Sequence, residues 1–77
     1  MKCTQYFLST CQRADRACIE TAWIEFVIQH PAQELIQQDG RIRRWASISE
    51  ANGKYLRVVL LPDGETVHNA FFDRGFA

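Results

Sequence analysis

Apolar residues recur at helical spacing between residues 19 and 30. The recurring apolar positions are Ile19, Ala22, Trp23, Phe26 and Val27, and His30 continues the same spacing. Steps of three and four residues place such positions on one face of an α-helix. Ile24 and Ile28 widen this apolar stripe, which favours a helix largely covered by a sheet. Because the residue before a proline disfavours the helical region, the helix is predicted to end at His30, just before Pro31.

A shorter helix is predicted before this one, over residues 9–15. The run Ser9-Thr10-Cys11-Gln12 has the form of a capping box. In such a box the serine caps the first turn and the glutamine reaches back to the serine backbone. Ser9 is therefore the predicted N-cap.

Beyond Pro31 the pattern changes to strands separated by turns. Asp39-Gly40, Asn52-Gly53 and Asp63-Gly64 suit type I′ turns, in which both central residues need positive φ. The segments of strand composition are 33–38, 41–48, 54–61 and 65–72. The first of them also suits a continued helix, and this alternative stays open. The order of elements predicts an α+β fold, with N-terminal helices packed on a three- to four-stranded antiparallel β-meander.

The last turn sets the register of the last predicted hairpin. With Asp63-Gly64 as a two-residue turn, Leu60 pairs with Val67 and Leu56 with Phe71. Side chains alternate across a sheet. The face predicted against the helix holds Leu56, Val58, Leu60, Val67 and Phe71. The opposite face is predicted to hold Tyr55, Arg57, Val59, Thr66, His68, Ala70 and Phe72. A slip of one residue would exchange the two faces.

The same register predicts which side chains form the core. The residues expected to be buried together are Trp23, Phe26, Leu56, Val58 and Leu60. Trp45 is predicted to be less buried than Trp23.

Length and hydropathy limit the class of protein. A chain of 77 residues predicts one domain, residues 1–77. No apolar stretch approaches the roughly 20 residues that span a bilayer. Residues 1–5 lack the apolar run of a secretory signal. These observations predict a cytoplasmic protein without a membrane partner.

Charge is balanced overall but not along the chain. The formal net charge is zero, which weakens a nucleic-acid interpretation. The stretch 41–61 is nevertheless basic, since it has only Glu50 against five cations. These are Arg41, Arg43, Arg44, Lys54 and Arg57. The stretch is either a solvated sheet face or an anion-binding patch.

The cysteines predict neither a disulfide framework nor a metal site. Cys3, Cys11 and Cys18 are odd in number and form no Cys-x-x-Cys pair. A zinc site that adds His30 is not supported by the spacing. There is also no glycine-rich phosphate loop. We therefore expect no cofactor and no metal.

Helices followed by a four-stranded meander resemble the RelE/ParE-type toxin fold. The sequence is also similar to a small uncharacterised bacterial domain family of unknown function that is grouped with such toxins. The similarity covers nearly the whole chain. It is carried by residues 12–16, 23–24, 30–31, 40–45, 55–59 and 63–74, the last reading Asp-Gly-Glu-Thr-Val-His-Asn-Ala-Phe-Phe-Asp-Arg.

The resemblance implies a toxin–antitoxin protein. RelE-like toxins cut messenger RNA on the ribosome without a metal, using basic residues and often a tyrosine or histidine. ParE-like relatives act on gyrase instead. The resemblance therefore implies RNA or the ribosome as target and a cognate antitoxin as partner.

Metal-free RNA cleavage needs a proton acceptor, a cation for the phosphorane charge and a proton donor. His68, Arg57 and Tyr55 fall on one predicted face and are the predicted catalytic residues. The predicted binding residues are Arg41, Arg43, Arg44 and Lys54. The alternatives are purely structural roles. His68 would then be a half-exposed histidine in a strand, and Arg57 would form an ion pair with Glu65 or Asp73. One arginine is also placed to stack on Trp45.

A rival hypothesis belongs to another class. The chain would then be a non-catalytic homodimeric or partner-binding domain that buries its exposed sheet face. That face would present Trp45, Val59, Ala70 and Phe72. Whether the chain is an enzyme stays open at this stage.

Overall fold

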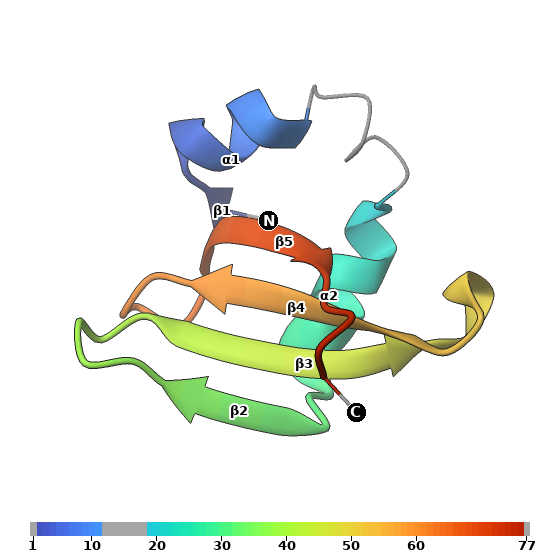
Figure 1. Ribbon diagram of the computed structural model, residues 1–77. Helices are drawn as coiled ribbons and strands as arrows, with labels where there is room; N and C mark the ends of the chain where they lie inside the picture. The colour runs from blue at the N-terminus through green and yellow to red at the C-terminus, as the bar shows by residue number, and fades with distance from the viewer. Residues whose placement is uncertain (1, 12–18, 77) are drawn as a thin grey trace.

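The protein folds as helices on a mixed five-stranded sheet in a computed structural model, which describes residues 2–11 and 19–76. The strands are β1 (Lys2–Cys3), β2 (Gln33–Ile36), β3 (Ile42–Ile48), β4 (Lys54–Leu60) and β5 (Thr66–Phe72). The helices are α1 (Gln5–Cys11), α2 (Thr21–Gln29) and the 3-10 turn η1 (Ser49–Ala51). The order across the sheet is β1-β5-β4-β3-β2 (Figure 1).

The predicted α+β class and the antiparallel meander are confirmed. β2, β3, β4 and β5 pair antiparallel with their chain neighbours. The alternative of a continued helix over 33–38 is therefore wrong. β1 was not predicted: it joins β5 in parallel, with Lys2 opposite Thr66. Two residues are too few to carry a strand pattern of their own.

α2 covers one face of the sheet and α1 packs beyond it on β5. In Figure 1, α2 lies behind the sheet, while the end of the chain crosses in front of β4 and β3. We call the face opposite α2 the outer face. The core under the helices comprises Phe7, Ile24, Val27, Ala46, Ile48, Leu56, Val58, Leu60, Val67 and Ala70. Burying each large apolar side chain contributes about 1.5–3 kcal/mol.

α2 ends as predicted but is rotated from the predicted orientation. His30 caps the helix, and its backbone N–H donates to the Phe26 carbonyl at 2.8 Å. Ile24 and Val27 are buried, whereas Phe26 is 46% exposed, so its predicted place in the core is wrong. Trp23 is only half-buried, with its ring edge-on to Phe72. A helix apolar on most sides does not specify which side faces the sheet.

α1 begins four residues before the predicted start. The Phe7 N–H donates to the Thr4 hydroxyl at 3.1 Å, so Thr4 and not Ser9 caps the helix. Thr4 is in turn held by the sheet, because its N–H donates to the Val67 carbonyl at 3.0 Å. Ser9 lies inside the helix. Residues 12–15 of the predicted helix lie outside the described residues.

The three glycine turns adopt positive φ, as predicted for Gly40, Gly53 and Gly64. The turns at Asp39-Gly40 and Asp63-Gly64 are nevertheless not type I′, since Asn52 is the one described non-glycine residue with positive φ. The Gly64 N–H donates to the Leu61 carbonyl at 2.9 Å, so Pro62 and Asp63 are the central turn residues. The Asp63 carboxylate accepts the backbone N–H groups of Glu65 and Thr66, each at 2.9 Å.

A bulge at His68 changes the predicted faces of β5. Leu60 pairs with Val67 as predicted, but Val59 then pairs with Asn69, so His68 is the extra residue. Beyond it every pair moves by one position, and Arg57 faces Phe71. Ala70 and Phe72 therefore lie toward α2 and Phe71 lies on the outer face, which reverses their predicted sides. No pattern of apolar and polar residues marks such an insertion.

Candidate functional site on the outer face

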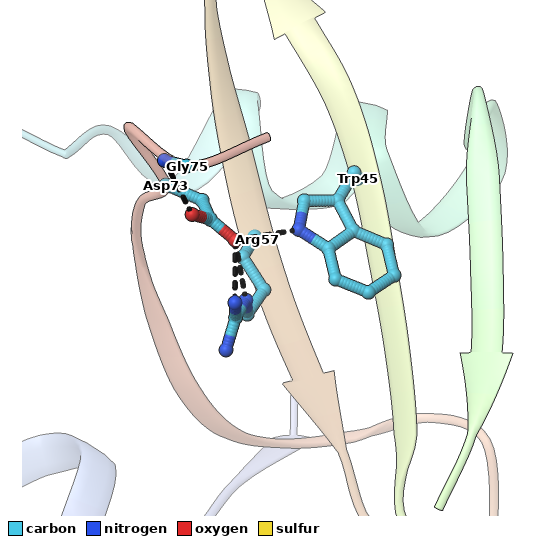
Figure 2. A network of polar contacts seen from close by, with 4 residues as sticks. All are labelled: Trp45, Arg57, Asp73 and Gly75. Carbon is cyan, nitrogen blue, oxygen red and sulfur yellow. Dashed lines mark hydrogen bonds and ion pairs between the residues drawn. The ribbon is translucent and has the colours of Figure 1, made fainter. Parts of the chain in front are cut away.

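The outer face is organised around the carboxylate of Asp73, directly after β5. Its Oδ2 accepts hydrogen bonds from Trp45 Nε1 at 3.0 Å and from Arg57 Nε at 3.0 Å and Nη2 at 2.5 Å (Figure 2). Its Oδ1 accepts the Gly75 N–H at 3.0 Å. We call Trp45, Arg57, Asp73 and Gly75 the Asp73 network. It ties β3 and β4 to the segment that follows β5.

The Arg57 guanidinium is sandwiched as well as paired. It lies 5.4 Å from the centre of the Trp45 ring and 4.8 Å from that of Phe71. Phe76 stacks on Trp45, the other side chain that donates to Asp73. The two ring centres lie 5.1 Å apart and the ring planes are tilted by 16°. Trp45 is consequently only 5% exposed. Its predicted exposure is wrong because the end of the chain folds back over it.

The network neutralises the charge of Arg57. Hydrogen bonds from Trp45, and then from Arg57, lower the pKa of Asp73 below its ordinary value, although partial burial opposes this. The side chains of Arg57 and Asp73 are 23% and 14% exposed. Arg57 therefore forms the ion pair with Asp73 that was one of the two open interpretations. Its fork is engaged and is not free to grip a phosphate.

His68 belongs to a different set of contacts. Its Nδ1 lies 3.2 Å from the Thr4 hydroxyl oxygen. Its ring stacks on Tyr6 of α1, with centroids 5.0 Å apart and planes at 24°. These contacts share no residue with the Asp73 network. The described contacts of His68 therefore do not include Arg57, its predicted catalytic partner, and they assign His68 to the docking of α1.

The predicted binding arginines are also separated. Arg41 is paired with Asp39, with Nε and Oδ2 3.6 Å apart. Arg44 is paired with Glu34 at 2.6 Å and donates to the Ile28 carbonyl at 2.9 Å, which links β3 to the end of α2. Arg43 donates from Nη2 to the Gln37 amide oxygen at 3.0 Å when the amide takes the orientation in which its nitrogen also donates to Asp39. No single patch of these arginines exists among the described residues.

One hollow does gather cations and aromatic rings. It has a volume of about 750 Å³ and lies where β4 begins and β5 ends. Its lining includes the cationic and aromatic side chains of Lys54, Tyr55, Phe71, Arg74 and Phe76. We call it the Tyr55 hollow. The rings of Tyr55 and Phe76 lie 4.7 Å apart within it.

Among the described residues, the two cations of the Tyr55 hollow lack the carboxylate partner that most other cations have. Within residues 2–11 and 19–76, Lys54 and Arg74 form no ion pair, whereas Lys2, Arg41, Arg44 and Arg57 each do. Both are exposed. Sequence reasoning identified Lys54 and Tyr55 but missed Arg74 and Phe76. The available signal was the charged pair Asp73-Arg74 with aromatic residues on both sides, in Phe71-Phe72-Asp73-Arg74-Gly75-Phe76.

Comparisons with models of protein families, with curated proteins and with solved structures found no match to this chain. The resemblance to RelE/ParE-type toxins therefore stays a prediction. In the described part of the chain, no cluster of histidine, cysteine and carboxylate side chains is suited to hold a metal ion. In the same residues no helix has the length and apolar character needed to cross a bilayer.

Proposed function

We propose that the protein is a small toxin-type domain that binds single-stranded RNA in the Tyr55 hollow. The observation that carries this proposal is the gathering of Lys54 and Arg74, free of carboxylate partners among the described residues, around Tyr55 and Phe76. Proteins that bind single strands combine cations that follow the phosphates with aromatic rings on which bases stack. The resemblance to RelE/ParE-type toxins supports the same class of target.

The network behind the hollow supports binding in a defined geometry. Asp73 and Phe71 line the hollow, and both contact Arg57. Phe76 is fixed by stacking on Trp45. Rings held in place lose less conformational entropy when a base stacks on them. Arg57 is therefore proposed as a positioning residue behind the site and not as a phosphate ligand.

The proposal concerns binding first and cleavage second. Of the predicted catalytic residues His68, Arg57 and Tyr55, only Tyr55 lines the hollow. His68 is engaged with Thr4 and Tyr6. If the protein cuts RNA, Tyr55 is the proton carrier that we propose, with Lys54 and Arg74 stabilising the phosphorane charge. A cognate antitoxin would then cover this hollow.

The binding test uses a single-stranded RNA oligonucleotide and fluorescence anisotropy over a range of salt concentrations. We expect the double variant Lys54→Gln/Arg74→Gln to bind more weakly. The negative slope of log affinity against log salt should become shallower by about 1.4, because two phosphate contacts are lost at about 0.7 each. The matched control is Arg41→Gln/Arg43→Gln, which removes the same charge from cations outside the hollow and should change the slope little.

Two results would overturn the proposal. One is a parent protein with no affinity for RNA at low salt. The other is an equal loss of affinity in the control and in the hollow variant, since binding would then depend on net charge alone. Expression in bacteria complements the assay, because a toxin should arrest growth in the parent and not in Lys54→Gln/Arg74→Gln.

Cleavage is tested separately with Tyr55→Phe. This change removes the hydroxyl and keeps the ring, so RNA affinity should remain. If Tyr55 transfers a proton, cleavage of RNA by the protein with ribosomes should slow by about 10²–10⁴-fold. Cleavage that is unchanged in Tyr55→Phe would remove Tyr55 from the chemistry and leave the binding proposal standing.

A further inference from the structure

The two edges of the sheet are protected to different degrees. At one edge, β1 has only two residues. Its Lys2 forms an ion pair with Glu65, which directly precedes β5. Short strands and lysine are devices by which proteins prevent edge-to-edge pairing. At the other edge, all four residues of β2 are exposed. Among them Leu35 is 50% and Ile36 64% exposed.

β2 lacks the usual protection of an edge strand. It contains neither proline nor lysine, and Glu34 is its single charged residue. The Glu34 carboxylate is already neutralised by Arg44 at 2.6 Å. Its charge therefore does little to repel an approaching strand. Two large apolar side chains remain in contact with water, one on each face of the sheet.

The backbone of β2 directs hydrogen-bonding groups outward at two residues. The Gln37 N–H donates to the Arg41 carbonyl at 2.8 Å. Because bonded and non-bonded pairs alternate in an antiparallel ladder, the groups of Leu35 point to Arg43 on β3. The N–H and C=O groups of Glu34 and Ile36 then point away from β3, toward the open edge.

We propose that β2 is a homodimerisation strand, which pairs antiparallel with β2 of a second copy around a twofold axis at Leu35. This inference goes beyond the proposed function and uses a different part of the molecule. In this register Glu34 of one copy exchanges both hydrogen bonds with Ile36 of the other. Leu35 meets Leu35 across the axis on the outer face.

The chemistry of β2 favours a second copy as the occupant. The two outward-directed residues are symmetric about Leu35, so one twofold operation satisfies all four of their backbone groups in each chain. A register centred on Glu34 would oppose like charges, which destabilises strand pairing. The register at Leu35 instead places Ile36 against the stems of Glu34 and Arg44. Since β1 is protected at the other edge, the assembly closes as a dimer and does not extend.

The test is analytical ultracentrifugation of the full chain over a range of concentrations. We expect the parent to sediment at twice its mass of 8.9 kDa. Leu35→Lys places two lysines face to face across the axis, so the dimer dissociation constant should rise by about tenfold or more. The control is Leu8→Lys, which changes a similarly exposed leucine, 45% against 50%, on α1. It should leave the dimer intact.

A charge-swap experiment guards against a folding defect. Equal amounts of Leu35→Lys and Leu35→Glu chains should form a heterodimer, although each alone is a monomer, because opposite charges then meet across the axis. A parent that is monomeric at every concentration overturns the proposal, and so does a dimer that survives Leu35→Lys. Dissociation by Leu8→Lys or failure of the mixed chains to associate would also exclude β2 as the interface.

Discussion

The indole N–H of Trp45 donates to the Asp73 carboxylate at 3.0 Å, and this hydrogen bond joins the middle of β3 to the chain beyond β5. Arg57 donates to the same oxygen from the intervening strand. A single carboxylate oxygen thus holds the outer face together across three strands. The aromatic wall of the Tyr55 hollow depends on it, because Phe76 stacks on Trp45.

We therefore predict that Asp73→Ala destabilises the fold. The change leaves the Trp45 N–H and the partly buried Arg57 charge without their acceptor, at a cost of about 1–3 kcal/mol. Urea unfolding monitored by tryptophan fluorescence measures it. Glu65→Ala removes a more exposed carboxylate, paired with Lys2, and serves as control. Equal stability of Asp73→Ala and Glu65→Ala would show that the Asp73 network contributes nothing.

Acid should weaken the turn between β4 and β5. Hydrogen bonds from Thr66 and Glu65 lower the pKa of Asp63 to about 2. The unfolded chain, with an aspartate pKa of about 3.9, binds the proton first as pH falls. The contribution of Asp63 is thus fully present above pH 4 and is lost as pH falls toward 2.

The variant Asp63→Asn isolates this contribution. We expect the parent to lose stability between pH 4 and pH 2 more steeply than Asp63→Asn does, since the variant has no carboxylate to protonate at this turn. Asp73 acts in the same direction in both proteins, because its pKa is also lowered. Unfolding free energies measured by urea titration across this pH range give the comparison. Parallel pH profiles would refute the assignment.

A third prediction concerns the rotation of α2. Ile24 is 2% exposed and Phe26 46% exposed. Ile24→Ala should therefore cost about 2–5 kcal/mol through lost burial and a residual cavity. Phe26→Ala should cost much less, although phenylalanine is the larger side chain. Thermal unfolding followed by circular dichroism distinguishes the two. A larger loss for Phe26→Ala than for Ile24→Ala would contradict the orientation of α2.

Local chemistry was sufficient to predict much of the fold. The end of α2 at His30 follows from Pro31, and the positive φ values of Gly40, Gly53 and Gly64 follow from turn positions that disfavour a side chain. The four antiparallel strands follow from these turns and from the composition between them. In each case the cause lies within a few residues of its effect, so it can be read along the chain.

The candidate site was predicted only in part, because its geometry arises from contacts between distant residues. Lys54 and Tyr55 were identified, and the ion pair of Arg57 with Asp73 was one open alternative. The extra residue at His68, however, moves Phe71 to the outer face, and no local pattern marks it. Phe76 covers Trp45 from 31 positions further along the chain.

The rotation of α2 is of the same kind. Its apolar residues nearly surround the helix, so several orientations satisfy the pattern equally well. Packing against β3 and β4 selects the one in which Ile24 and Val27 face the sheet. The sequence by itself thus determined α2, the strands from β3 to β5 and the glycine turns, whereas it missed β1 and misplaced the start of α1. Only the tertiary structure decided which of their faces meet, because close packing is a property of both surfaces together.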